Sequence, residues 1–282
     1  ALVLALALVL PTSVFAQNAA VTVNVDANAN RRPISPYIYG VAFASTTQLA
    51  DLNAPLNRSG GNATSSYNWQ QNATNRGGDW YFESIPEASA TAGEMGDSFI
   101  AGSRAAGAEA MITIPMLDWV AKLGANRSKL AAFSQAKYGQ QTDSDWQWMP
   151  DAGNGVLRST GKNITNNDPN DANTPAGVAF QQGWMQHLVA RWGLAANGGQ
   201  KFYLLDNEHS LWQSTHREIK QTGATMDEIR ELVRTVEETS GAATVNGRFS
   251  LSPVCAPLGT YSGYCSPLSN RMYEPSLRFC SA

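Results

Sequence analysis

An apolar run that ends in an amide and a carboxylate is the strongest chemical signal in the sequence. The run Phe-Tyr-Leu-Leu at residues 202–205 is followed directly by Asp206, Asn207 and Glu208. Such a run predicts a short buried strand. In a parallel α/β barrel the reacting side chains lie at the carboxyl ends of the strands, so Glu208 is a candidate catalytic acid. The alternative is that these polar residues only cap the helix that follows the strand.

The overall composition limits the classes of ligand that the protein can bind. The chain has 282 residues, is 43% hydrophobic and carries a net charge of −3, which predicts one globular domain of barrel size. Charged residues make up 15% of the sequence and form no basic cluster. Nucleic acid and anionic membrane surfaces, which require concentrated positive charge, are therefore not expected as partners. Eight Trp and nine Tyr suit binding of neutral polar ligands, although most aromatic side chains are expected in the core.

The first residues have the pattern of an export signal. Residues 1–10 contain only Ala, Leu and Val, and they are followed by Pro11 and by Val-Phe-Ala at residues 14–16. This pattern predicts a signal peptide over residues 1–16 and a secreted, extracellular mature protein that begins near Gln17. The apolar run is too short to span a bilayer, which makes a membrane anchor the weaker alternative.

Strand and helix patterns alternate along the chain in the order of a (β/α)8 barrel. Strands are predicted at residues 34–43, 54–58, 110–117 and 202–208, and helices at residues 98–110 and 180–192. A further strand is predicted at residues 21–25, and long loops at residues 62–80 and 140–175. Four strands with crossovers correspond to about the first four β/α units of a TIM-type barrel.

Several motifs together resemble glycoside hydrolase family 44. They are Leu-Asn-Arg-Ser-Gly-Gly-Asn-Ala-Thr at residues 56–64, Asp-Trp-Tyr-Phe-Glu-Ser at 79–84, Asn-Asp-Pro-Asn-Asp-Ala-Asn at 167–173 and Leu-Asp-Asn-Glu at 205–208. The resemblance is collinear from about residue 34 to residue 230. It implies a secreted, monomeric endo-β-1,4-glucanase or xyloglucanase that acts on cellulose or xyloglucan and needs no cofactor for catalysis. It also implies a barrel joined to a small β-sandwich, to which residues 17–33 would contribute a strand.

The resemblance also assigns roles to individual residues. Glu208 matches the general acid/base of a retaining mechanism, Asn207 the group that binds the sugar 2-hydroxyl, and Arg58 the basic residue near the nucleophile. Further substrate-binding candidates are Asn62, Trp69, Trp80 and Trp119. A retaining glycosidase needs a second carboxylate about 5–5.5 Å from the first. Because neighbouring residues on a strand point to opposite faces, that carboxylate must come from another strand.

The second carboxylate is not apparent in the sequence. Family members carry it on the seventh barrel strand, whereas residues 245–282 form an atypical tail that contains all three cysteines, Cys255, Cys265 and Cys280. Glu274 is the one late carboxylate, and no strand pattern precedes it. We therefore expect residues 34–244 to form the first half of the barrel and the tail to reflect truncation or a frameshift. The chain would then be inactive as it stands, and the alternative function is a non-catalytic glucan-binding fragment.

Three carboxylates are candidates for a structural calcium site. Glu83, Asp168 and Asp171 offer the hard oxygen ligands that calcium prefers. The alternative is a solvated turn in which the Asp and Asn side chains cap their own backbone.

Overall fold

The computed structural model describes residues 22–29, 31, 33–230 and 248–251, and the chain divides into two compact units. In the first unit, residues 1–34, the described residues form a turn and no strand, and Val23 and Val25 are 77% and 82% exposed. The strand predicted at residues 21–25 is thus not seen over residues 22–25, and the accessory sandwich stays a prediction. The predicted signal peptide and residues 252–282 of the tail lie outside the described residues.

The second unit, residues 35–282, is built on a parallel sheet. Its strand order is β1-β2-β5-β9-β10. The bounds are β1 (Val41–Ala42), β2 (Leu56–Ser59), β5 (Glu109–Ile114), β9 (Phe202–Leu205) and β10 (Arg248–Leu251). All four neighbouring pairs are parallel, so the carboxyl ends of the strands share one edge of the sheet. The alternating order and the parallel sheet confirm the predicted barrel class.

Strand β10 corrects the sequence analysis, which placed residues 245–282 in a tail without strands. The structure pairs Arg248 with Phe202 and Leu251 with Leu205, so β10 continues the sheet beyond β9. The described sheet therefore has five parallel strands, one more than the four predicted. The strand was missed because Arg-Phe-Ser-Leu is not a continuous apolar run like that of β9, and because pairing with β9 depends on main-chain hydrogen bonds that no local pattern reveals.

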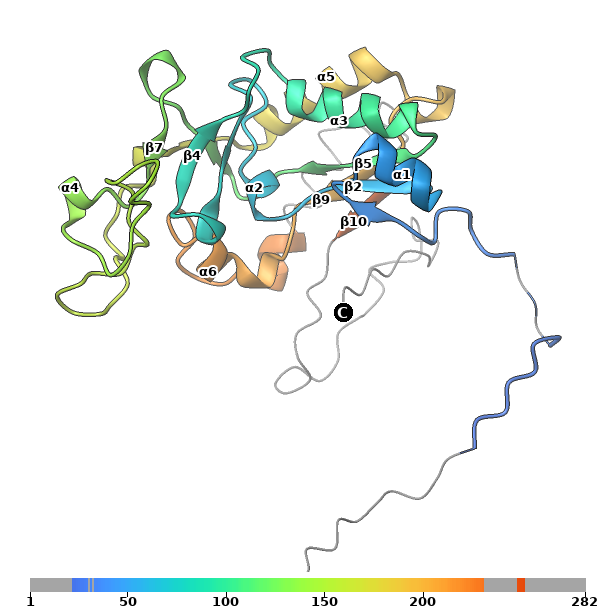
Figure 1. Cartoon of the computed structure of the whole chain (residues 1–282), viewed down its shortest axis with the longest axis horizontal. Coiled ribbons are helices and arrows are strands. Elements are labelled where there is room, and N and C mark those ends of the chain that lie inside the picture. The colour runs from blue at the N-terminus through green and yellow to red at the C-terminus, as the bar shows by residue number, and fades with distance from the viewer. Residues whose placement is uncertain (1–21, 30, 32, 231–247, 252–282) are drawn as a thin grey trace, which may run out of the picture. The chain divides into compact units, whose positions relative to one another are not determined.

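Three main helices accompany these strands. They are α1 (Thr46–Leu52), α3 (Glu94–Ala105) and α5 (Val178–Trp192), and α3 and α5 both contact β5 (Figure 1). Helix α1 begins with a capping box, in which the Ser45 hydroxyl accepts from the Gln48 amide and the Gln48 side chain accepts from the Ser45 amide. Trp184 and Leu188 of α5 are buried in the main core cluster, together with Ile112 of β5. None of the helices in the described ranges has the length and apolar character needed to cross a membrane.

Two long connections form a separate layer of short elements. The first connection, after β2, contains α2 (Asn62–Ser65), β3 (Ala73–Asn75), η1 (Gly77–Asp79) and β4 (Glu83–Pro86). The second, after β5, contains β6 (Trp119–Ala121), η2 (Ala125–Arg127), β7 (Leu130–Ala131), α4 (Gln135–Tyr138), η3 (Pro169–Asp171) and β8 (Asn173–Pro175). Strands β3, β4 and β7 form one antiparallel sheet, and β6 and β8 form another.

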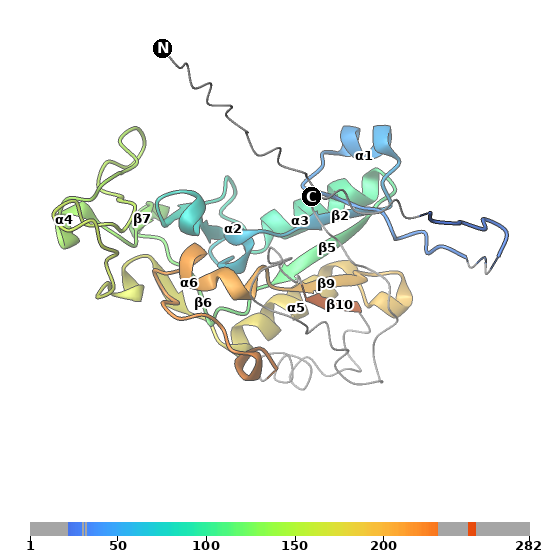
Figure 2. The ribbon, with the colours of Figure 1, turned by 90° about the horizontal axis from the view of Figure 1, so that it is seen from below.

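The chain after α5 leads back to this layer. It contains η4 (Ala195–Asn197), β9, η5 (His209–Leu211) and α6 (Trp212–Thr215). Two views at right angles place α6 between β9 and the α4–β7 end of the layer (Figures 1 and 2). Both long connections follow the carboxyl ends of parallel strands, as does the segment with Glu208. All three therefore belong to the side of the sheet that carries active sites in parallel barrels.

Candidate active site

The backbone turns sharply at the end of β9. Asp206 and Glu208 have φ values of 57° and 47°, in the left-handed region that non-glycine residues seldom adopt. The amide of Asp206 still donates to the carbonyl of Ile114 on β5, at 3.1 Å, so the departure from the sheet begins at residue 207. Left-handed residues of this kind persist where the surrounding contacts hold them, and they cluster at active sites.

Asp206 supplies part of that support. Its carboxylate is fully buried and accepts hydrogen bonds from the amides of Met116 and Asn207, each at 2.6 Å. Burial raises the pKa of Asp206, while the charge of His209 and the hydrogen bonds to the carboxylate oppose the rise. Asp206 therefore ties the end of β9 to the segment that follows β5. Asp206 was not among the predicted site residues, although a carboxylate at the end of an apolar strand is a signal of such a buried anchor.

A hydrogen-bonded row connects the three residues that the family resemblance singled out. Nη2 of Arg58 donates to Oδ1 of Asn207 at 2.5 Å, and Nδ2 of Asn207 donates to Oε2 of Glu208 at 3.2 Å. Arg58 lies on β2 and the other two follow β9, with β5 between these strands. Burial lowers the pKa of Arg58, and the nearby charge of Glu208 opposes this shift. The fold thus brings together residues that are 149 positions apart in the chain.

The space for the Arg58 side chain depends on a glycine. A Cβ atom on Gly60 would lie 2.7 Å from Cζ of Arg58, closer than van der Waals contact allows. The Gly-Gly sequence after β2 therefore permits the guanidinium to fold back along the chain toward Asn207.

The segment after Glu208 packs beneath the row. Nε1 of Trp212 donates to the carbonyl of Asn207 at 3.0 Å, and the rings of Trp212 and His209 lie 4.7 Å apart. Burial lowers the pKa of His209, although the charge of Asp206 opposes the shift. These contacts fix the backbone on both sides of Glu208, whose own side chain is partly exposed.

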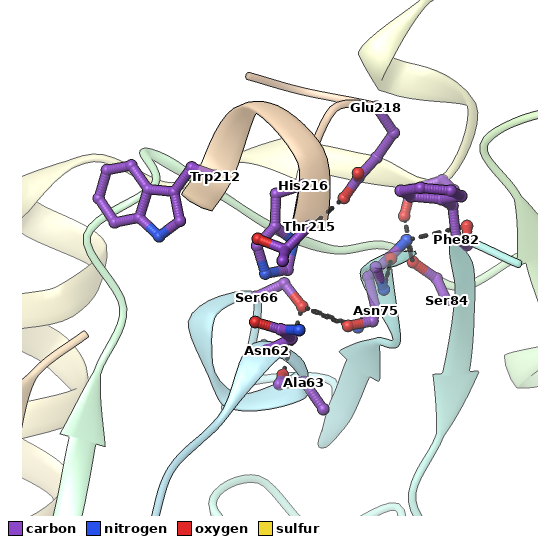
Figure 3. Close-up of polar contacts among 12 residues, drawn as sticks. Asn62, Ala63, Ser66, Asn75, Phe82, Ser84, Trp212, Thr215, His216 and Glu218 are labelled. Carbon is purple, nitrogen blue, oxygen red and sulfur yellow. Dashed lines mark hydrogen bonds and ion pairs between the residues drawn. The ribbon is translucent and has the colours of Figure 1, made fainter. Parts of the chain in front are cut away.

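A buried ion pair lies directly after α6. Nδ1 of His216 lies 3.3 Å from Oε1 of Glu218, and neither side chain is exposed. Burial lowers the pKa of His216, but the hydrogen bond and charge of Glu218 prevail and raise it above its usual value. Figure 3 shows His216 directed from α6 toward Ser66, and Glu218 on the side of Phe82. A Cβ atom on Gly77 of η1 would lie 3.0 Å from the His216 ring, so His216 packs the segment after Glu208 against the loop that follows Arg58.

The other predicted binding residues lie in varied environments. Asn62 donates to Asp79 at 3.0 Å, which ties α2 to η1. Trp69 stacks on Trp184 of α5 with ring centres 6.1 Å apart, a packing contact that gives no support to a sugar-stacking role. Trp119 is half-buried on β6. In the described part of the chain, none of these side chains forms a hydrogen bond with Glu208.

Of the three tryptophans predicted to bind substrate, Trp80 is the exposed one. It is 38% exposed and lies 5.5 Å from the ring of Trp148. Trp148 was not among the predicted binding residues, although a Trp-Gln-Trp motif at residues 146–148 within an Asp- and Gly-rich loop is a signal of exposed aromatic groups. Glu274, the late carboxylate that no strand pattern precedes, lies outside the described residues.

The three candidate calcium ligands, Glu83, Asp168 and Asp171, differ in whether their oxygens already have partners in the chain. Glu83 is fully buried, neither of its oxygens accepts a hydrogen bond from the residues that the structure describes, and Nζ of Lys129 lies 3.6 Å away. Burial, together with nearby Asp145, raises the pKa of Glu83 to about 7, although Lys129 opposes the rise. A buried carboxylate of this kind fits a metal ligand, and calcium bound there would supply the charge that keeps it ionised.

Asp168 and Asp171 already have partners in the chain. Oδ1 of Asp168 accepts from the amide of Asn170 at 2.9 Å, and Asp171 pairs with Lys137 at 2.6 Å and with Tyr138 at 2.5 Å. Within the ranges that the structure describes, no three acidic, His or Cys side chains form a metal-binding group. Glu83 fits the calcium assignment better than the two Asp residues do, and the site as a whole stays a prediction.

The sequence is similar to known proteins over most of its length. The model of glycoside hydrolase family 44 matches residues 73–250. Among characterised proteins, the chain is 26% identical over 242 residues to beta-mannanase/endoglucanase A of Caldicellulosiruptor saccharolyticus, and covers 16% of it. It is 29% identical over 225 residues to endoglucanase A of Paenibacillus lautus, and covers 29% of that protein. These matches involve 80% and 74% of this chain, respectively.

Solved structures show the same relationship. CelM2, a bifunctional glucanase-xylanase from a metagenome library, is 62% identical with a TM-score of 0.77, over 79% of this chain and 43% of CelM2. A family 44 xyloglucanase of Paenibacillus polymyxa shares the fold at 24% identity, with a TM-score of 0.54 over 77% of this chain and 41% of that one. The chain therefore spans less than half the length of each of these relatives.

Proposed function

Because the chain belongs to glycoside hydrolase family 44, we propose that it is part of a secreted endo-acting hydrolase of β-1,4-linked glucans such as cellulose and xyloglucan. Endoglucanase, glucanase-xylanase and xyloglucanase are the activities named for its relatives. The observation that carries the proposal is the row Arg58–Asn207–Glu208 at the carboxyl edge of the sheet. In this row, the side-chain amide of Asn207 is oriented by Arg58 and donates to the carboxyl group of Glu208.

In the proposed retaining mechanism, Glu208 is the general acid/base. It protonates the glycosidic oxygen, while a second carboxylate attacks the anomeric carbon and forms a glycosyl-enzyme intermediate. Glu208 then removes a proton from the water that hydrolyses this intermediate. Since the amide oxygen of Asn207 accepts from Arg58, its Nδ2 is left to donate toward Glu208 and toward a sugar hydroxyl. Arg58 therefore acts as a positioning residue for Asn207.

The nucleophile is expected in a part of the relatives that this chain does not cover. We propose that the chain by itself releases no reducing sugar from carboxymethyl cellulose or xyloglucan. A non-catalytic glucan-binding role is the second candidate, and the exposed Trp80 and Trp148 favour it. If the chain releases reducing sugar and the Glu208→Gln variant does not, the chain supplies both carboxylates. That result would contradict the proposal that the chain is inactive by itself.

The role of Glu208 is best tested in a complete barrel. Residues 35–251 would replace the corresponding segment of CelM2, which is 62% identical to this chain. Glu208→Gln in this chimaera is expected to lower kcat by about 10²–10⁴-fold, the range for loss of a general acid. Glu109→Gln, which removes a pair with Lys201 at the opposite end of β5, is the control and should retain activity. Full activity of Glu208→Gln would exclude Glu208 as the acid/base.

Localisation and assembly form part of the same proposal. Export is supported by the composition of residues 1–16, and amino-terminal sequencing of the exported protein should begin at Gln17. An amino-terminus that retains residues 1–16 would contradict cleavage there. We propose that the protein acts as a monomer on polysaccharide, without nucleic-acid or membrane partners. Light scattering in solution would reveal a larger assembly if this is wrong.

A further inference from the structure

A short hydrogen-bonded unit connects the main chain before Glu208 to the buried pair of His216 and Glu218. The indole of Trp212 donates to the carbonyl of Asn207 at 3.0 Å, and the amide of His216 donates to the carbonyl of Trp212 at 2.8 Å. Trp212 begins α6 and His216 caps its end (Figure 3). The backbone of Asn207 and the ring of His216 are therefore the two ends of one unit built on α6.

The residues after α6 attach the far end of this unit to both long connections. Arg217 lies over the rings of Phe82 and Phe133, at 4.7 and 4.9 Å. The carbonyl of Glu218 accepts from the side chain of Asn167 at 2.7 Å. Phe82 belongs to the first connection, and Phe133 and Asn167 belong to the second. The position of α6 is thus determined where the chain enters it and where the chain leaves it.

The two charges of the pair depend on each other. His216 and Glu218 are both 0% exposed, and Nδ1 of the ring lies 3.3 Å from Oε1 of the carboxylate. Nε2 of His216 and Oε2 of Glu218 have no hydrogen-bond partner among the residues that the structure describes. Loss of one charge would leave the other buried and uncompensated, which is more costly than loss of both. The buried arrangement is therefore stable only while His216 is protonated.

Acidic groups from three segments favour the protonated ring. Burial lowers the pKa of His216, but the hydrogen bond and charge of Glu218, together with two further carboxylates, raise it above its usual value. The two are Asp206, directly after β9, and Asp79 of η1. Arg217, the adjacent cation, is also influenced by the charge of Glu218. Since the folded state holds the proton more tightly, the stabilisation is complete below pH 6.5 and is lost as pH rises through the pKa of the folded protein.

We propose that His216 and Glu218 are positioning residues for the acid/base, which act through α6 on the main chain that carries Glu208. The catalytic part of this inference rests on the proposed function. Glu208 has a φ of 47°, a conformation that its surroundings must impose. When His216 loses its charge, Glu218 is expected to move toward water and α6 to follow it. The hydrogen bond between Trp212 and Asn207 should then lengthen.

The indole proton of Trp212 tests this coupling in the full chain. Its NMR signal is followed from about pH 5 to about pH 9, which spans the pKa values of most histidines in proteins, together with the ring signals of the three histidines. The indole signal is expected to shift with the midpoint of the His216 ring and to lose that shift in His216→Gln. His209 also lies near Trp212, at 4.7 Å, but burial lowers its pKa, so that its effect occurs at lower pH.

Two further variants make the result decisive. Glu218→Gln removes the partner at every pH and should displace the indole signal throughout the range. His187→Gln is the matched control, because His187 pairs with Asp97 at 2.8 Å between α5 and α3, and it should leave the indole signal unchanged. An indole signal that stays constant in Glu218→Gln, or that follows only His209, would overturn the proposal.

Kinetics in the chimaera separate positioning from general stability. At a temperature where melting curves show that each variant is folded, Glu218→Gln should lower kcat about 10- to 100-fold, as for a small misplacement of a reacting group. KM should change less than about twofold, because substrate contacts are retained. Unchanged kcat in Glu218→Gln would overturn the positioning role. Full activity of Glu208→Gln would instead overturn the proposed function and leave the coupling between His216 and Trp212 intact.

Discussion

Arg58 on β2 donates a hydrogen bond to the side-chain oxygen of Asn207 beyond β9, across the intervening strand β5. Asn207 is 5% exposed, and its side-chain nitrogen Nδ2 donates to Glu208. An amide in this position is oriented by the guanidinium and not by its own strand. The geometry of the proposed acid therefore depends on a residue that is distant in sequence.

A double-mutant cycle measures this dependence. Arg58→Met and Asn207→Ala, separately and together, should show a coupling of about 1.5–3 kcal/mol in the free energy of unfolding, as for hydrogen bonds to charged groups. Urea denaturation provides the four values. The exposed pair Arg230 and Asp227 serves as the control cycle, where coupling should not exceed about 1 kcal/mol. Additive effects of Arg58→Met and Asn207→Ala would mean that the hydrogen bond contributes little.

Gly60→Ala is expected to displace the Arg58 side chain. The new methyl group would meet the guanidinium, and overpacking of this kind costs about 1–3 kcal/mol. Gly102→Ala is the matched control, because Gly102 lies inside α3 with its nearest neighbour atom 3.5 Å away. There alanine should stabilise by about 0.5–1 kcal/mol, since glycine disfavours a helix interior. Thermal melting shows whether each substitution raises or lowers the melting temperature. Stabilisation by both substitutions would contradict the role of Gly60.

Glu83 should make stability depend on pH when calcium is removed. Burial raises its pKa in the folded protein from 4.5 to about 7. The folded state therefore keeps the proton to a higher pH than the unfolded state does, and the stabilisation is present below pH 4.5 and is lost as pH rises toward 7. The free energy of unfolding should fall by about 3 kcal/mol over this range. Glu83→Gln should reduce the fall, and equal slopes in both proteins would contradict the assignment.

Calcium binding can be measured separately from this effect. If Glu83, Asp168 and Asp171 are ligands, calcium should raise the melting temperature, because an ion that binds only the folded state stabilises it. The shift should disappear in the double variant Asp168→Ala, Asp171→Ala. Asp227→Ala, at an exposed carboxylate elsewhere, is the control. A calcium-dependent shift that survives in the double variant would remove the two Asp residues from the site and leave Glu83 to bind with other groups.

Local patterns were sufficient for the main elements. The apolar run at residues 202–205 and the amphipathic segment predicted β9 and α5 to within three residues, and the small-residue segment predicted α3 to within five. These patterns depend on neighbouring positions, which the sequence displays directly. The alternation of strands and helices then indicated a parallel barrel, because parallel strands require crossovers.

Contacts between distant segments could not be predicted in the same way. Strand β10 is defined by its pairing with β9, and the environment of Trp69 by its packing on Trp184. The ring contact between Trp80 and Trp148 joins two loops whose residues are far apart in the chain. Loop sequences carry little periodicity, so their approach is determined by packing and by side-chain hydrogen bonds such as those that Asp145 accepts from Trp80 and Trp148.

The amino-acid sequence by itself determined which groups are available for chemistry: a carboxyl group at the end of a buried strand, a preceding amide, and an arginine beside two glycines. The tertiary structure alone decided that Arg58, Asn207 and Glu208 form one hydrogen-bonded row, and that two tryptophans share an exposed surface. The physical reason is that residue type and local periodicity are properties of short segments. The orientation of an amide or an indole, by contrast, depends on groups that only the folded chain brings within hydrogen-bonding distance.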